Sequence, residues 1–324
     1  MRKVIMVPTE GSDSERPAIA LAVKLAQRFD AELRLVRVET PPFAAEAATA
    51  PPVLLITEGT LRDARLARRR KLEAMGADWS KLTGIDVTTA LEDGPVGPTL
   101  VAYAERFGVD WIVMSSHCRG GLKRMTLGSV TDYLIRHSNV PVIVSKQEQS
   151  PVGVVPDVFF GRIVVPLDGS TLAEEILPRV AELASPLNST VSLLHVLTPV
   201  TYSQNAIMQP GLPWWDNDIA KAEAYLADAS VYLTERGLTV SKEVVLSDDI
   251  ATAIIDYLVR SRADLVAIAT RGIGGMSRLV FGTVADKVTR QSPTSVLVFH
   301  PDPAHNLVRD DSHEPPGAKA TVEA

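Results

Sequence analysis

The chain has one cysteine, few aromatic residues and no long hydrophobic run. One cysteine cannot form an internal disulfide, which fits a reducing cytosol. No apolar stretch approaches the ~20 residues of a membrane span, and no basic and apolar leader precedes the first expected strand. We therefore expect a cytoplasmic protein without membrane association. The net charge of −6 gives no electrostatic reason to expect a nucleic-acid partner.

Several chemical motifs are also missing. The histidines are scattered, and none has metal-ligand spacing with another, so we expect no structural metal. No P-loop G-x-x-x-x-G-K-[ST] is present. The dinucleotide fingerprint G-x-G-x-x-G fails as well, because Gly272-Ile273-Gly274 is followed by Ser277 where the third glycine belongs.

The chain does contain an internal repeat. Val4–Ser12 returns as Ile163–Ser170, and His117–Val130 returns as Arg271–Val284. The prolines of the first pair are 158 residues apart, and the Gly-Ser and Gly-Thr steps of the second pair are 154 apart. Two landmarks at nearly one period predict two copies of one domain, and so long a period excludes a solenoid of small units.

Each copy alternates short apolar runs with helical ones, which predicts an α/β fold with a mostly parallel sheet covered on both faces. The expected strands are Val4–Val7, Leu33–Val38, Val87–Leu91, Trp111–Ser115, Val142–Val144, Ile163–Pro166, Val191–Val196, Lys242–Leu246, Leu265–Ala269 and Val296–Phe299. The expected helices are Glu15–Phe29, Leu61–Met75, Pro98–Arg106, Val130–His137, Ala173–Ala184, Ile219–Arg236, Ala251–Arg260 and Val284–Arg290.

The composition divides the chain into four parts. We expect a first domain over 1–147, a polar linker over 148–160 and a second domain over 161–300. Residues 301–324 are rich in proline and aspartate and can bury little, which predicts a disordered tail.

In each copy, a Gly-containing loop follows the fourth strand and leads to Gly-Ser or Gly-Thr at the start of a helix. Glycines let backbone N–H groups approach a phosphate closely, and a helix N-terminus supplies unpaired donors and a positive dipole end. This arrangement predicts an anion site. A tight turn with a helix cap is the alternative reading of the same residues.

Both copies resemble the universal stress protein domain, whose signature is G-x2-G-x9-G-[S/T]. The second copy reads Ala269-x2-Gly272-x9-Gly282-Thr283, and the first reads Ser115-x2-Cys118-x9-Gly128-Ser129. The resemblance covers residue 3 to about residue 299. It implies two five-stranded parallel Rossmann-like domains packed as a pseudo-dimer, with ATP, with or without Mg²⁺, at the carboxyl ends of the strands.

Carried over residue by residue, the resemblance implies a nearly complete nucleotide site in the second copy. Its members are Pro166, Leu167, Asp168, Val196, Ile268, Ala269, Arg271, Gly272, Gly282, Thr283 and Val284. A turn role is the alternative for Asp168, and a solvated surface role is the alternative for Arg271.

The first copy departs from the signature at three places. Glu10 replaces the shorter acid, and Ser115 and Cys118 replace glycines, so that two Cβ substituents stand where backbone should approach phosphate. The implied degenerate site comprises Pro8, Thr9, Glu10, Val38, Met114, Ser115, Cys118, Gly128, Ser129 and Val130.

The resemblance implies a stress-response or regulatory protein that binds ATP or a related adenine nucleotide, mainly in the second domain. A nucleotide-free scaffold is one alternative, and an enzyme that hydrolyses ATP slowly is another. No positioned base, nucleophile or carboxylate pair is evident, so we expect no other catalysis. A homodimer or another protein partner is left open.

Two expectations concern packing. The terminal strands Val142–Val144 and Val296–Phe299 would otherwise be bare edges, so we expect the copies to pack face to face through them. Pro213-Trp214-Trp215 is expected in a loop, either packed at an interface or buried locally.

Overall fold

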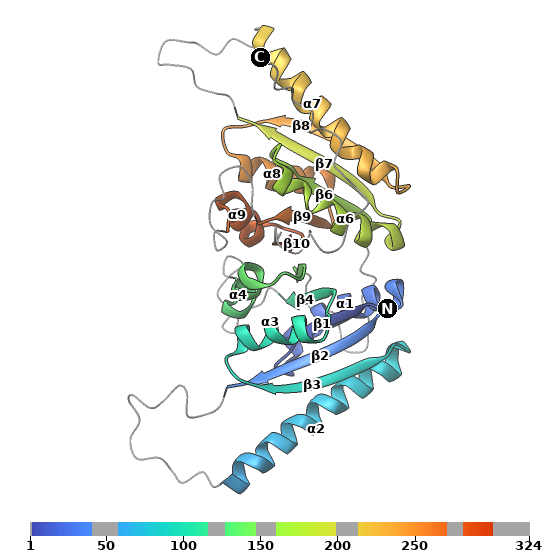
Figure 1. Cartoon of the computed structure of the whole chain (residues 1–324), viewed down its shortest axis with the longest axis vertical. Helices are drawn as coiled ribbons and strands as arrows, with labels where there is room; N and C mark the ends of the chain where they lie inside the picture. Colours follow the sequence, from blue (N-terminus) through green and yellow to red (C-terminus); the bar gives the residue numbers. More distant parts are fainter. Residues whose placement is uncertain are drawn as a thin grey trace, which may run out of the picture.

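The computed structural model describes residues 2–40, 58–115, 127–146, 160–198, 213–270 and 281–300. Within these residues the strands form one continuous sheet in the order β3-β2-β1-β4-β5-β10-β9-β6-β7-β8 (Figure 1). The first five strands are parallel to one another, and so are the last five. The prediction of two five-stranded parallel α/β units is confirmed.

Strands and helices alternate along both units. The first unit contains β1 (Val4–Pro8), the short 3-10 turn η1 (Asp13–Glu15), α1 (Arg16–Phe29), β2 (Glu32–Glu39), α2 (Glu58–Thr83), β3 (Val87–Asp93), α3 (Val96–Arg106), β4 (Trp111–Ser115), α4 (Ser129–His137) and β5 (Val142–Ser145). The second contains β6 (Arg162–Pro166), α5 (Thr171–Glu174), α6 (Leu177–Ala184), η2 (Ser185–Leu187), β7 (Thr190–Leu197), α7 (Pro213–Thr234), β8 (Thr239–Leu246), α8 (Ile250–Ser261), β9 (Leu265–Ala269), α9 (Thr283–Gln291) and β10 (Ser295–Phe299).

The two units meet through their last strands. β5 and β10 pair antiparallel, with Leu297 opposite Ile143 at the centre of the ladder. Pairing of the last strands was predicted, but the expected face-to-face packing is wrong, because the sheets join edge to edge. In-plane pairing satisfies the backbone N–H and C=O groups that a bare edge would leave open.

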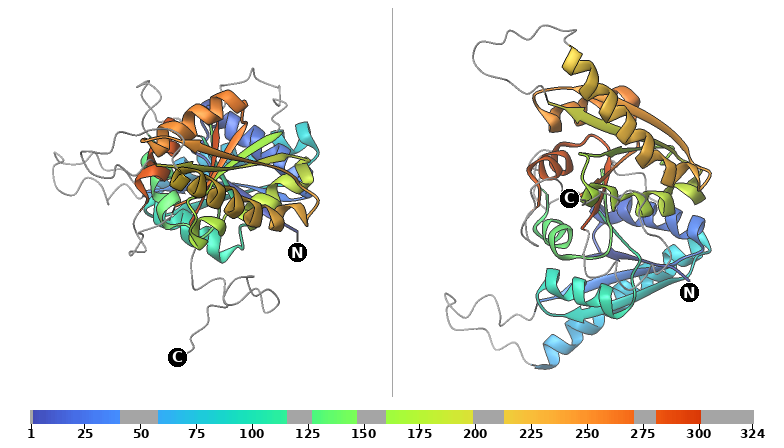
Figure 2. Two further views of the ribbon diagram at one scale, coloured as in Figure 1. Left: turned by 90° about the horizontal axis from the view of Figure 1, so that it is seen from above. Right: turned by 45° about the horizontal axis from the view of Figure 1, so that its top comes forward.

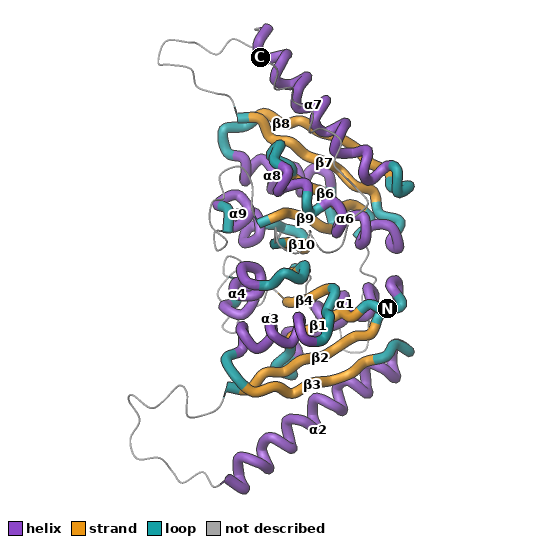
Figure 3. The backbone as a smooth tube through the Cα atoms, in the orientation of Figure 1, coloured by secondary structure: helices purple, strands orange, loops and turns teal. Residues whose placement is uncertain are grey.

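Helices cover both faces of the joined sheet (Figures 2 and 3). One face carries α1, α2, α6 and α7 over a core that includes Ile5, Trp111, Ile163 and Leu226. The other carries α3, α4, α8 and α9 over a second core. Each core contains residues of both units, so the two units share their hydrophobic layers as well as their sheet.

Three helices differ from the sequence-based expectation. The helix expected over Ala173–Ala184 is divided into α5 and α6, because Pro178 lies in the first turn of α6 and cannot continue a preceding helix. α2 runs on to Thr83, well past the expected end. Trp214 and Trp215 lie in the first turn of α7 rather than in a loop, since Pro213 favours the first helical position.

Candidate functional site

The second unit has a topological switch point between β6 and β9. These strands are parallel neighbours, with Ile163 opposite Leu265. β6 leads to α5 and α6 on one face of the sheet, whereas β9 leads to α9 on the other. Open α/β sheets bind ligands at the carboxyl ends of strands that diverge in this way. In Figure 1 this edge of the sheet faces left.

The loop after β6 forms one side of this switch point. Leu167 is buried, and its N–H donates to the Leu194 carbonyl at 2.9 Å. The exposed Asp168 accepts hydrogen bonds from the Ser170 N–H at 3.0 Å and from its hydroxyl at 2.6 Å. Ser170 in turn caps α5, because its Oγ accepts from the Ala173 N–H at 3.1 Å. Asp168 therefore stabilises the turn after β6, and it also lies beside the switch point.

The wall beside this loop comes from β7 and α7. Val196 is half-buried, and the neighbouring His195 places its Nδ1 2.8 Å from the Leu167 carbonyl oxygen. The His195 ring meets Tyr225 edge-on, with the centroids 5.7 Å apart. Burial, followed by the nearby Glu174 carboxylate, raises the pKa of the Tyr225 hydroxyl. These contacts hold the loop after β6 against β7 and α7.

The start of α9 forms the opposite side. The N-cap is Gly282, which has no side chain to pair with the first amides of the helix. The Gly282 N–H donates to the Thr270 carbonyl at 3.0 Å, which links the start of α9 to the end of β9. A Cβ at position 282 would lie 3.4 Å from that oxygen, so glycine suits the close approach. The Thr270 hydroxyl is in turn 2.7 Å from Nδ1 of the buried His300.

The structure gathers most of the predicted second-domain residues at this edge. They are Pro166, Leu167, Asp168, Val196, Ile268, Ala269, Gly282, Thr283 and Val284. Arg271 and Gly272 lie outside the described residues. Ile268 and Ala269 are buried in β9, whereas Thr283 is exposed at the first position of α9.

The first unit repeats the arrangement between β1 and β4. Pro8, Thr9, Glu10, Val38, Met114, Ser115, Gly128, Ser129 and Val130 lie at the corresponding strand and helix ends, and Cys118 lies outside the described residues. Two side chains here were not among the sequence-based candidates. The Glu15 carboxylate accepts from the Glu10 N–H at 2.8 Å, and an Arg37 nitrogen donates to the Glu10 carbonyl at 2.6 Å.

A signal for both residues exists in the repeat. At the same offset as the paired prolines, Ala173 corresponds to Glu15 and His195 corresponds to Arg37. Comparing the copies at every position near the strand ends, rather than only within the signature, would have found them.

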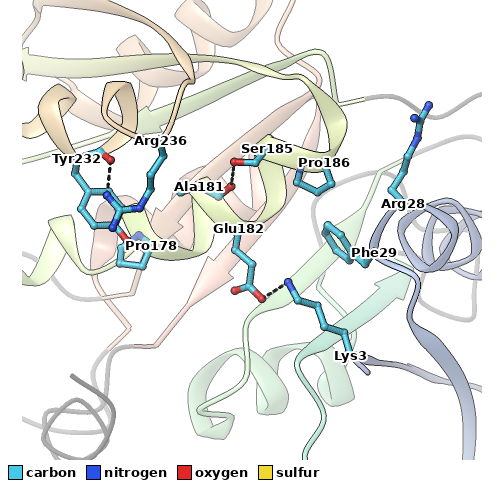
Figure 4. A pocket seen from close by; sticks show the side chains of 10 residues that line it. All are labelled: Lys3, Arg28, Phe29, Pro178, Ala181, Glu182, Ser185, Pro186, Tyr232 and Arg236. Atoms are coloured by element: carbon cyan, nitrogen blue, oxygen red, sulfur yellow. Dashed lines mark hydrogen bonds and ion pairs between the residues drawn. The ribbon is translucent and has the colours of Figure 1, made fainter. Parts of the chain in front are cut away.

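An open cleft of about 680 Å³ lies between the units, away from the predicted site residues (Figure 4). Its first-unit side includes Lys3 and Phe29, and Lys3 pairs with Glu182 of the second unit at 2.6 Å. Lys3 also stands over the Phe29 ring, 4.8 Å from its centroid. The cleft shares no residue with the predicted site.

The described part of the chain holds no group of three or more His, Cys, Asp or Glu side chains placed to bind a metal ion. No helix within it is both long enough and apolar enough to cross a membrane.

The duplicated α/β domain, with a parallel sheet covered on both faces and a switch point in each copy, defines the class of doubly wound α/β domains. The model of the universal stress protein family matches residues 1–146 and again residues 160–300. The chain therefore belongs to the universal stress protein family, as a member with two such domains.

The chain is also similar to several individual proteins. A universal stress protein of Mycobacterium tuberculosis is 28% identical over 296 residues, which cover 88% of this chain and 93% of that protein. The structure of a universal stress protein from Archaeoglobus fulgidus DSM 4304 matches 92% of this chain and 98% of its own, with TM-score 0.63 and 18% identity. A universal stress protein solved in complex with cAMP matches 44% of this chain, with TM-score 0.33 and 21% identity.

Proposed function

We propose that this protein binds an adenine nucleotide, ATP in the first instance, mainly at the switch point of the second domain. The observation that carries the proposal is the start of α9. Gly282 leaves the first amides of that helix without a side-chain cap and ties the end of the preceding segment to Thr270. Such a helix end favours a phosphate group by hydrogen bonding and by its dipole.

The contrast with α8 supports this role. That helix begins at a cap, Asp249, whose carboxylate accepts from the Thr252 N–H at 3.1 Å and from Lys287 Nζ at 2.7 Å. The N-terminus of α8 is therefore satisfied within the protein, whereas α9 presents glycine where a ligand could supply the acceptor.

We further propose a regulatory, stress-response role in the cytoplasm rather than catalysis. The titratable groups described at the second switch point already serve the fold. Asp168 holds the turn through Ser170, and His195 faces a backbone carbonyl with Nδ1. Neither is placed as a general base beside a nucleophile. A nucleotide-free scaffold and a slow ATPase are the alternatives that the binding experiment separates.

Isothermal titration of the full chain with ATP, with and without Mg²⁺, tests the proposal. We expect one site per chain, with any first-domain site at least tenfold weaker. Gly272→Val should remove most of the binding, because a branched side chain would keep backbone donors from the phosphate. The control is Gly128→Val in the first domain, at the counterpart of Gly282, which should leave ATP binding in the second domain intact.

If Gly128→Val removes ATP binding and Gly272→Val does not, the nucleotide binds in the first domain, and the proposed location of the site is wrong. Absence of heat with ATP and with other adenine nucleotides would favour the scaffold. Release of phosphate from bound ATP on the timescale of the titration would favour the enzyme.

A further inference from the structure

The first domain holds a carboxylate of its own in the loop after β1. Glu15 accepts from three consecutive backbone N–H groups, those of Glu10 at 2.8 Å, Gly11 at 3.2 Å and Ser12 at 3.3 Å, and from the Thr9 hydroxyl. Gly11 has φ +77°, a left-handed conformation that turns these amides toward one point. A bound anion would accept hydrogen bonds from converging amides of this kind.

The second domain has no counterpart to this carboxylate. Ala173 stands at the position of Glu15, and a methyl group cannot reach the loop amides. The second loop uses short side chains instead, since Asp168 accepts from Ser170 and Ser170 accepts from Ala173. At this position the first domain has a glutamate and the second an alanine, although Glu174 and Glu175 follow in the second domain where the first has Arg16 and Pro17.

A second difference lies across the same switch point. Ser115, at the end of β4, donates from Oγ to the Ser14 carbonyl in η1 at 3.2 Å. This bond ties the end of β4 to the turn before α1, where the diverging strands should leave room for a ligand. In the second domain Ala269 occupies the position of Ser115, so the hydroxyl that donates this bond is missing there.

From these two matched positions we infer that Glu15 and Ser115 close the first domain to a phosphate-bearing nucleotide, and that Ala173 and Ala269 leave the second domain open. The inference rests on the proposed function, because it compares the first domain with a second domain that is taken to bind nucleotide. The mechanism is competition. A ligand's phosphate or ribose must displace the Glu15 carboxylate from four donors, and its charge is repelled while that carboxylate remains.

This account differs from the one that the signature alone suggests. The signature points to Cys118 as the obstacle, since a side chain there replaces a glycine of the phosphate loop. Glu15 lies outside the signature, and its contacts are described in full. The two explanations make different predictions for single substitutions.

The test gives the first domain the residues of the second. Glu15→Ala together with Ser115→Ala is built in the Gly272→Val background, so that ATP binding reports on the first domain alone. We expect one ATP site to appear, with affinity at least tenfold above the background variant. Glu105→Ala, which removes an exposed carboxylate from α3, is the control and should give no gain.

The reciprocal graft provides an independent measurement. Ala173→Glu should place a carboxylate in the second loop and lower ATP affinity of the otherwise natural chain at least tenfold. Thr171→Glu adds the same charge at an exposed position two residues earlier and should change affinity less than threefold. Circular dichroism and the urea midpoint show whether each variant is folded.

The outcomes separate the two proposals. If the natural chain binds one ATP but the opened first domain binds none, or if Cys118→Gly opens it and the double alanine variant does not, the inference is overturned. Two sites filled in the natural chain also overturn it. If the natural chain binds no ATP while the opened first domain does, the proposed function fails, and so does the claim that the second domain is open, but the closure of the first domain by Glu15 and Ser115 stands.

Discussion

Arg290 of the second domain donates from Nη2 to Oδ1 of Asp132 in the first domain at 2.9 Å. The matching contact, from Arg136 to Asp286, measures 3.5 Å. Within each helix the same arginine also pairs with its own aspartate, at 2.8 Å in α4 and 2.9 Å in α9. Each carboxylate therefore faces one cation from each domain, and the four side chains form a closed charge ring.

The charge ring affects the ionisation of its members. Burial opposes ionisation of Asp132, but the hydrogen bond from Arg136 and the charge of Arg290 outweigh it and hold the pKa of that carboxyl below its usual value. The Asp286 carboxylate raises the pKa of Arg290. The aspartates of the ring lie in the first turns of α4 and α9, and its arginines lie in the last turns of the same helices.

Removing both carboxylates of the charge ring should destabilise the join. In the Asp132→Asn, Asp286→Asn double variant, two guanidinium groups face each other without a counter-charge. We expect a loss of about 1–2 kcal/mol in the free energy of unfolding, more than for an exposed pair. Urea unfolding measures it. Asp218→Asn, which breaks the exposed pair with Lys221, should cost less than about 0.5 kcal/mol. Equal losses in the two variants would mean that the charge ring stabilises the protein no more than an exposed ion pair does.

The same ring predicts how stability depends on pH. Because the pKa of Asp132 is lowered in the folded state, its stabilising effect is complete above the unfolded pKa, near 3.8, and is lost as pH falls through the folded value. The Asp132→Asn variant should therefore lose less stability than the natural chain between pH 5 and about pH 2. Urea midpoints measured across that range give the comparison. Identical acid slopes for the two proteins would contradict the assigned shift.

The shared sheet and shared cores predict that both domains unfold together. Ile143, fully buried at the centre of β5, packs where the two units meet. Ile143→Ala should lower the free energy of unfolding by about 2–5 kcal/mol and move both domains at once. With Trp79, Trp214 and Trp215 replaced by Phe, Trp111 fluorescence reports on the first domain, and far-ultraviolet circular dichroism reports on the whole chain. Val259→Ala on an exposed position of α8 is the control. Two separate transitions in the natural chain would disprove the coupling.

Tyr225 should resist ionisation. Burial raises its pKa above the ordinary value of 10.0, so the neutral phenol is favoured in the folded state. Its contribution to stability is present below that ordinary value and declines as pH rises further. The ultraviolet difference titration between the natural chain and Tyr225→Phe should show no phenolate near pH 10. A normal titration step in that difference would show that the hydroxyl is solvated.

The residues of the candidate site that belong to the local signature were predictable from the sequence. Gly282 and Thr283 begin α9, and Asp168 follows β6, because the spacing of the signature reflects the path of one strand, one loop and one helix. Glu15 was not predictable in this way. A glutamate at the start of a helix is ordinary in a sequence, and its four donors depend on the backbone geometry of the loop.

The sequence by itself determined the duplication, the α/β class and the alternation of strands and helices within each repeat, because periodicity and turn residues act over short distances along the chain. Pairing through the last strands was expected from the sequence, but only the tertiary structure decided that the copies meet edge to edge. Asp132 and Arg290 are 158 residues apart, and β5 meets β10 edge to edge. Such contacts depend on the angle and register at which two completed sheets pair, and no local pattern in the chain encodes that geometry.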